Sequence, residues 1–193
     1  MEIILASKSP ARREILERLG FRVLQIPAEV EEARIGEASL KEAVELAVGN
    51  ALKKAEKIAE RYPGKVVVAA DTLVYFEDRI LGKPRNEEEA RRFLLELKDK
   101  WHKVLSGYAV CTPKGFISGY EVTEVKMRNY REEEVEYYLS TGEYKGKAGG
   151  YAIQGLGAFL VEEVRGCFYN VAGLPLARIV EALLSLGYWP PLK

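Results

Sequence analysis

Short apolar runs alternate along the whole chain with longer segments in which apolar residues recur every three or four positions. The short runs predict β-strands, and the periodic segments predict amphipathic α-helices. The expected strands are residues 2–6, 21–26, 65–76, 80–81, 102–112, 116–127 and 159–164. No linker, repeat or low-complexity tract interrupts this alternation, which predicts a single α/β domain over residues 1–193.

Capping residues mark where several of the expected helices begin. Ser9 precedes a proline at the first helical position, Ser39 forms a capping box with Glu42, and Asn86 precedes a charged amphipathic segment. The expected helices are residues 10–19, 40–61, 87–98, 132–140 and 175–186. The run of residues 66–70 is apolar at every position and therefore predicts a strand that is buried on both faces.

Composition and charge narrow the class of protein. Lys+Arg and Asp+Glu number 29 each, so the net charge is zero and we expect no nucleic-acid partner held by bulk charge. No apolar run reaches the roughly 20 residues that span a bilayer, and residues 2–6 do not resemble a signal peptide. Cys111, Cys167 and His102 lack metal-ligand spacing, which favours structural roles over a disulfide or zinc site. We therefore expect a cytoplasmic protein without a membrane partner; abundant Glu and Lys also fit a thermophile.

The first candidate site lies where a strand runs directly into a helix, at residues 6–13. Free backbone N–H groups and the positive end of the helix dipole make such a point an anion site. Ser7 and Ser9 add hydroxyl groups, and Arg12 and Arg13 add guanidinium groups suited to phosphate. The alternative is an ordinary capped helix with two solvated arginines.

Asp71 is the second candidate, because it interrupts a buried strand. Burial of an ionised carboxylate there destabilises the folded protein by roughly several kcal/mol unless the carboxylate is paired or binds a metal. The turn at residues 77–79 brings the chain back, so Lys83 is expected beside Asp71. The pair could be a simple ion pair, or it could hold a metal-bound water against a phosphate; hydrogen bonds to backbone at a bulge are the remaining alternative.

Two further segments carry candidate ligands. Glu32 belongs to an acidic cluster after the second strand, which is either a solvated face or a source of carboxylate ligands for Mg²⁺. Residues 142–155 contain five glycines, which allow a ligand close to the backbone or give a plain flexible loop. Within them, Lys147 supplies charge and Gln154 can read a base edge.

One face of the long helix, formed by Ala43, Ala47, Asn50 and Lys54, combines small and polar residues. We expect part of this face to line a cleft rather than a core.

These segments together resemble the Maf family of nucleoside triphosphate pyrophosphatases. The run KAGGYAIQG is the most specific match. The matching stretches are residues 5–12, 30–32, 70–74, 81–84, 147–155 and 173–175. The resemblance implies an α/β fold in which a mixed twisted sheet with flanking helices forms two lobes around a deep cleft. It also implies hydrolysis of the α–β phosphate bond with Mg²⁺ or Mn²⁺; members of the family are often homodimers.

The resemblance also implies roles for individual residues. Asp71 matches the proton acceptor of the family. Arg12, Thr72 and Gln154 match its specificity determinants. Phosphate- and metal-side residues of the family are matched by Ser9, Glu32, Lys83 and Lys147. We expect Asp71 and Glu32 to hold the cation.

Sequence features that bear on the identity of the base point in two directions. Thr72 and the Tyr-Ala-Ile-Gln sequence that ends at Gln154 resemble the subgroup that acts on dTTP and UTP. The order Ser-Pro-X-Arg-Arg resembles the subgroup that acts on 7-methyl-GTP, and Asn50 stands where the family usually has a lysine. A dTTP/UTP pyrophosphatase is the prediction. The alternatives are a 7-methyl-GTP or ITP pyrophosphatase and a non-catalytic nucleotide-binding regulator of cell division.

Overall fold

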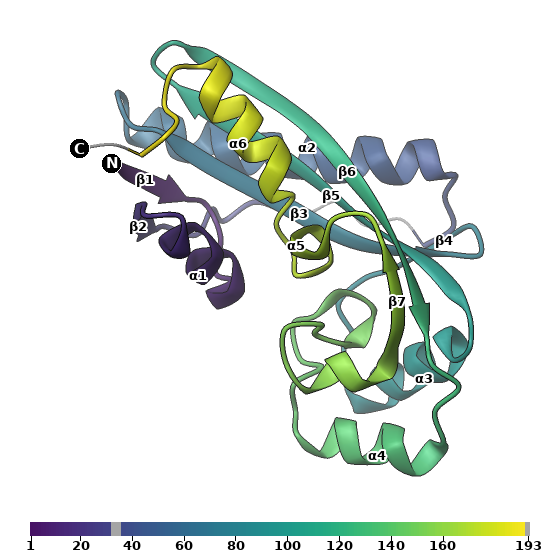
Figure 1. The fold of residues 1–193 in the computed structure, drawn as a ribbon. Helices are drawn as coiled ribbons and strands as arrows, with labels where there is room; N and C mark the ends of the chain where they lie inside the picture. Colours follow the sequence, from purple (N-terminus) through teal and green to yellow (C-terminus); the bar gives the residue numbers. More distant parts are fainter. Residues whose placement is uncertain (32–35, 192–193) are drawn as a thin grey trace.

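The computed structural model describes residues 1–31 and 36–191, which form a seven-stranded mixed sheet with helices on both faces (Figure 1). The strand order is β2-β1-β3-β5-β6-β7, and β4 pairs with the end of β3. β1 is parallel to β2 and β3, whereas the pairs β3–β5, β5–β6 and β6–β7 are antiparallel. The strands are β1 (Glu2–Leu5), β2 (Arg22–Gln25), β3 (Val67–Phe76), β4 (Arg79–Leu81), β5 (Trp101–Thr112), β6 (Gly115–Met127) and β7 (Val161–Arg165).

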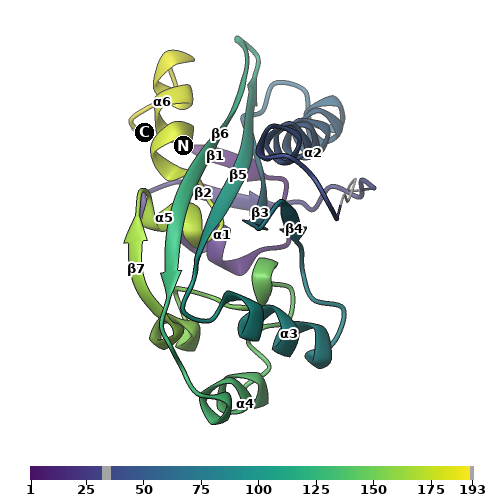
Figure 2. The same ribbon diagram turned by 90° about the vertical axis from the view of Figure 1, so that its right-hand side faces the viewer.

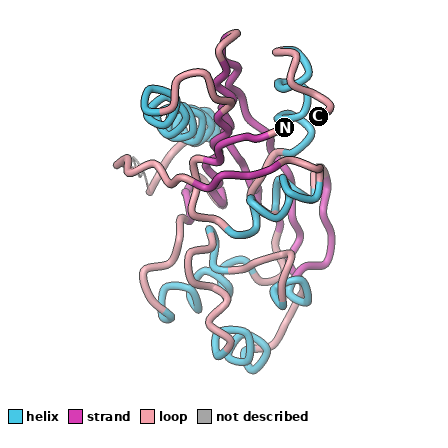
Figure 3. Tube along the Cα trace, turned by 90° about the vertical axis from the view of Figure 1, so that its left-hand side faces the viewer, coloured by secondary structure: helices cyan, strands magenta, loops and turns pink. Residues whose placement is uncertain are grey.

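The helices divide the molecule into two lobes. Figures 2 and 3 show α2 on one face of the sheet and α6 on the other. α3 and α4 gather at the far end of β5 and β6, where they form the smaller lobe with the glycine-rich segment. The helices are α1 (Pro10–Arg18), α2 (Leu40–Arg61), α3 (Glu87–Leu97), α4 (Glu132–Ser140), α5 (Phe168–Val171) and α6 (Leu176–Ser185).

Each lobe has its own apolar core. α1 and α6 pack on one face of the sheet through residues such as Leu16 and Leu183, and α2 packs on the other through Ala51 and Ile58. The smaller lobe is built around α3, α4 and the fully buried Tyr138. Among the described helices, none combines the length and apolar character needed to cross a bilayer.

The sequence predicted most elements to within two residues, and the capping residues act as expected. Ser9 accepts a hydrogen bond from the Arg12 backbone, and Ser39 and Glu42 form the predicted capping box. The last strand begins two residues later than predicted: residues 156–160 form a 3₁₀ turn, so β7 begins at Val161. Leu160 is buried in the smaller lobe, and this tertiary packing favours the turn over an extended strand. The short helix α5 was not predicted.

Gly107 sets the distance between α2 and the sheet. It lies on β5 directly opposite Asp71 of β3, and a Cβ atom there would overlap the backbone of Ala47. We expect Gly107→Ala to destabilise the protein by about 3 kcal/mol, because the helix backbone cannot move away without disturbing its whole packed face. Urea-induced unfolding measures this loss.

Gly49 on α2 provides the control for this substitution. A Cβ atom at Gly49 would meet nothing within 4 Å, and its position is helical. Gly49→Ala should therefore stabilise the protein by about 0.5–1 kcal/mol through helix propensity. Equal effects of the two substitutions would contradict the close approach at Gly107.

His102 fastens the glycine-rich segment to β5. Its Nε2 lies 2.7 Å from the hydroxyl group of Tyr151, the two rings meet edge to face, and the side chain is 3% exposed. Burial in this apolar surrounding lowers the pKa of His102 to about 3. A structural role, as the sequence predicted, fits this environment.

The buried imidazole gives the stability a pH dependence. Below about pH 6.5 the unfolded chain protonates His102 and the folded chain does not, so stability is full above that pH and falls as the pH drops toward 3. Between pH 7.5 and pH 5 the loss should be about 2 kcal/mol from this group. His102→Gln removes the titration, so unfolding at both pH values should show a shallower loss in the variant. Identical pH dependence in both proteins would contradict this assignment.

Candidate active site

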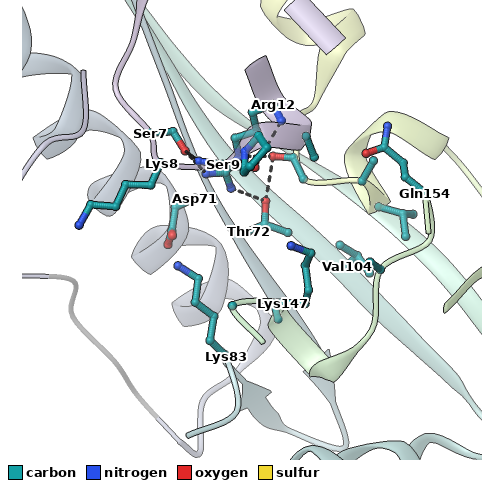
Figure 4. Close-up of a pocket in the computed structure, with 18 of the residues that line it drawn as sticks. Ser7, Lys8, Ser9, Arg12, Asp71, Thr72, Lys83, Val104, Lys147 and Gln154 are labelled. Carbon is teal, nitrogen blue, oxygen red and sulfur yellow. Dashed lines mark hydrogen bonds between the residues drawn. The ribbon is translucent and has the colours of Figure 1, made fainter. Parts of the chain in front are cut away.

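A cavity of about 590 Å³ opens between the two lobes (Figure 4). Its walls come from the start of α1, the middle of α2 and β3, the glycine-rich segment, and the residues that follow α5. This confirms the predicted cleft between two lobes. The predicted site residues that line it are Ser7, Ser9, Arg12, Asp71, Thr72, Lys83, Lys147 and Gln154.

The turn between β1 and α1 is held by its own serines. Ser7 Oγ accepts a hydrogen bond from the Ser9 backbone N–H at 3.1 Å, and Ser9 Oγ accepts one from the Arg12 backbone N–H at 3.3 Å. Proline at the first helical position has no N–H group to satisfy. The helix therefore begins at the cavity wall, with its positive dipole end at that wall.

Arg12 ties three segments together at the floor of the cavity. Its Nε donates to the Gly173 carbonyl oxygen at 2.6 Å, Nη1 to Ser7 Oγ at 3.1 Å and Nη2 to Thr72 Oγ1 at 3.0 Å. Thr72 Oγ1 also lies 2.8 Å from Ser106 Oγ and 3.2 Å from the Gly173 carbonyl oxygen. The two predicted specificity residues Arg12 and Thr72 are thus fixed by one network.

Asp71 is 6% exposed and is bound by two side chains of α2. Asn50 Nδ2 donates to Asp71 Oδ2 at 3.0 Å, and Lys54 Nζ lies 3.4 Å from Asp71 Oδ1. The β3–β5 pairing runs without a bulge through this position, so the alternative of backbone hydrogen bonds at a bulge is wrong.

Lys83 was predicted to lie beside Asp71, where the two groups would form an ion pair or hold a metal-bound water against a phosphate; the ion pair that Asp71 makes within the described residues is with Lys54. Lys83 lines the same cavity and points toward Asp71 in Figure 4. The expectation that part of this face of the long helix lines a cleft is confirmed. Asn50 and Lys54 line cavities, whereas Ala43 and Ala47 are buried against the sheet.

Among the described site residues that the sequence predicted, Arg13 does not join the cavity. Arg13 is half exposed and its Nε pairs with Glu17 at 2.8 Å on the outer face of α1, so it does not lie among the lining residues. Successive residues of a helix point about 100° apart, which is why Arg12 faces the cavity and Arg13 does not. Glu32 lies outside the described residues.

The cavity is rich in positive charge. Among the described lining residues only Glu29 and Asp71 are acidic. The basic lining residues are Lys8, Arg12, Lys54, Lys83, Lys145 and Lys147. Such an excess, next to a helix N-terminus, suits a polyanion such as a triphosphate. Gln154, which is exposed within the cavity wall, adds one amide donor pair and one acceptor.

The single carboxylate of Asp71 suits a cation whose other ligands come from water and a substrate. Within residues 1–31 and 36–191, no group of three or more His, Cys, Asp or Glu side chains is gathered for a metal. Mg²⁺ normally takes one or two carboxylates and completes its shell with water and phosphate oxygens. A carboxylate has about four acceptor positions, and the two described donors leave room on Asp71 for a cation.

Comparison with known proteins places the chain in a family. A family model described as Maf-like protein matches residues 2–186. The dTTP/UTP pyrophosphatase of Pyrococcus horikoshii is 47% identical over 190 residues, which cover 98% of this chain and 99% of that protein. The protein of the same name from Dictyoglomus thermophilum is 46% identical over 97% of each chain. A dITP/XTP pyrophosphatase structure from Mycobacterium abscessus aligns over 96% of both chains with a TM-score of 0.49 and 19% identity. The chain belongs to the Maf family.

Proposed function

We propose that this protein is a nucleoside triphosphate pyrophosphatase that hydrolyses dTTP and UTP to the monophosphate and pyrophosphate. The observation that carries the proposal is the buried Asp71, held by Asn50 and Lys54 in the wall of a strongly basic cavity. Relatives of 46–47% identity that carry the name dTTP/UTP pyrophosphatase, matched over nearly their whole length, support the choice of substrate.

In the proposed mechanism, water attacks the α-phosphorus and pyrophosphate leaves. Asp71 accepts a hydrogen bond from the attacking water, orients it and takes its proton. Lys83 and Lys147, together with the N-terminal end of α1 at Ser9, bind the phosphate oxygens and offset the charge that builds up on them. The backbone N–H groups and the lysine ammonium groups are already in place before the substrate binds, so little reorganisation of the site is needed during the reaction.

A divalent cation, Mg²⁺ or Mn²⁺, belongs to this proposal. Asp71 would hold it together with Glu32 and the substrate phosphates, and the cation would polarise the phosphate. Cation-dependent turnover would support this part, and full activity after exhaustive chelation would contradict it.

The base is read, in this proposal, by Gln154 and by the network of Arg12 and Thr72. The imide edge of thymine and uracil offers one N–H donor beside carbonyl acceptors, and a side-chain amide can pair with both at once. A site built for such hydrogen bonds rejects a base that lacks them more strongly than an apolar pocket rejects a change of size.

The test is a substrate panel with purified protein and Mg²⁺: dTTP, UTP, CTP, GTP, 7-methyl-GTP and ITP. Pyrophosphate and free phosphate are measured separately. Pyrophosphate release from dTTP and UTP ahead of the other nucleotides is the expected result. A preference for 7-methyl-GTP or ITP would overturn the choice of base. Binding of dTTP without turnover of any nucleotide would overturn the enzymatic function in favour of a nucleotide-binding regulator.

A further inference from the structure

The carboxylate of Glu143 lies at the centre of the hydrogen bonds that hold the loop carrying Gln154. Its Oε2 accepts the Leu156 backbone N–H at 3.0 Å, and its Oε1 accepts the Gly157 backbone N–H at 3.1 Å. Oε1 also receives the hydroxyl group of Tyr138 at 3.1 Å. One side chain therefore satisfies two consecutive backbone donors just after Gln154.

Tyr138 fixes the loop by a hydrogen bond on the N-terminal side of Gln154. Its hydroxyl oxygen accepts the Ala152 backbone N–H at 3.0 Å while the O–H donates to Glu143. The ring is fully buried in the core of the smaller lobe, where it packs edge to face on Phe159. Burial, with the nearby Glu143 charge, raises the pKa of Tyr138, so the phenol keeps its donor proton. Residues 152 and 156–157 are thus anchored to α4 on both sides of Gln154.

The glycines of the loop show how closely the carboxylate and the backbone approach. A Cβ atom on Gly155 would lie 2.5 Å from Glu143 Oε1, and one on Gly157 would lie 2.7 Å from the Ala152 carbonyl oxygen. At Gly157 the obstacle is backbone, whereas at Gly155 it is the end of the Glu143 side chain, which a Cβ atom would displace. Gly155 directly follows Gln154, so the Glu143 carboxylate lies against the backbone that sets the direction of the Gln154 side chain.

We propose that Glu143 is a positioning residue for base recognition, which acts through the backbone of residues 152–157 on Gln154. It is not among the described residues that line the cavity, whereas Gln154 is, so Glu143 acts without touching the nucleotide. The inference rests on the proposed function in one respect, the assignment of Gln154 to the base. That Glu143 and Tyr138 fix the loop follows from their hydrogen bonds and does not depend on the proposed function.

Glu143→Gln is a sharp probe because it keeps the size of the side chain and changes only the hydrogen bonding. A carboxylate accepts at both oxygens, whereas an amide donates at one of the two positions. Either orientation of the new amide places an NH₂ group against a backbone N–H of Leu156 or Gly157. At least one loop donor loses its partner, and the loop is no longer fixed at that point.

The experiment compares kcat and KM for dTTP, UTP, CTP and GTP in four proteins: wild type, Glu143→Gln, Gln154→Ala and the double variant. We expect Glu143→Gln to raise KM for dTTP and UTP about tenfold with little change in kcat, which narrows the preference over CTP and GTP. In the Gln154→Ala background the same substitution should change KM less than twofold, because its effect passes through Gln154. Glu133→Gln, the same change on the exposed face of α4, is the matched control.

Hydrogen exchange and dTTP affinity test the proposal independently of catalytic turnover. The amides of Leu156 and Gly157 should exchange faster in Glu143→Gln, while the free energy of global unfolding changes little. Gly155→Ala, which pushes the carboxylate away, should reproduce the rise in KM and serves if Glu143→Gln does not fold. Unchanged exchange, unchanged dTTP affinity, or an equal effect in both backgrounds would overturn the proposal. Absence of dTTP and UTP turnover by the wild type would instead overturn the proposed function.

Discussion

Asp71→Asn is expected to lower kcat for dTTP and UTP by about 10²–10⁴-fold, the range that a general base contributes. The substitution keeps the size of the side chain and removes its capacity to take a proton from water. An amide at this position keeps one acceptor oxygen, so one of the two donors, Asn50 Nδ2 or Lys54 Nζ, keeps its partner and the other faces the new NH₂ group. Urea unfolding of the variant checks that it is folded. Nucleotide affinity should stay within a few-fold of the wild type, because Lys83, Lys147 and Gln154, the residues assigned to the phosphates and the base, are unchanged.

Single-turnover kinetics and calorimetric titration with dTTP measure these two effects separately. Asp99→Asn is the matched control, since Asp99 is an exposed residue with a positive φ of 58° that asparagine also tolerates. It should leave kcat unchanged. If Asp71→Asn kept a tenth of the wild-type kcat, Asp71 would not be the proton acceptor.

The importance of Asp71 could be predicted from the sequence, because a lone carboxylate in an apolar strand needs a partner. Its partners could not be identified in the same way. Lys83 is near in sequence and follows a visible turn, so it was the natural choice. Lys54 reaches Asp71 only because α2 packs onto β5 at Gly107, which faces Asp71 across the sheet. The sequence predicts that a helix covers a strand, and it does not predict the depth of that packing.

The same limit explains Arg13 and Glu143. Arg13 has the right chemistry for phosphate, but its position on α1 faces Glu17 and solvent. Glu143 looks like an ordinary surface glutamate in a glycine-rich segment, and its partners are backbone N–H groups 13 and 14 residues away. Every residue type except proline has a backbone N–H group, so hydrogen bonds to the backbone cannot be recognised from the residue types in the sequence. Gly155 was one of the five glycines taken to allow a ligand close to the backbone or to give a flexible loop; in the structure it leaves space for the Glu143 carboxylate.

Lys54→Met tests the other half of the buried pair. The side chains of Lys54 and Asp71 are 9% and 8% exposed, so removal of the ammonium group leaves a poorly solvated carboxylate whose remaining described side-chain partner is the neutral Asn50 amide. We expect the free energy of unfolding to fall by about 3 kcal/mol, as for other buried pairs that lose one partner. We also expect kcat to fall about tenfold or more, because Asp71 loses a contact that orients it.

Urea unfolding and steady-state kinetics measure the two effects, and Lys53→Met, on the exposed side of α2, should cause neither. Lys54→Arg keeps the charge and should retain most of the stability. The deciding measurement is a double-mutant cycle: in the Asp71→Asn background no charged carboxylate is left to stabilise, so Lys54→Met should cost at most about 1 kcal/mol. The same cost in both backgrounds would mean that Lys54 stabilises α2 by itself, and that Asp71 is positioned by Asn50 without the lysine.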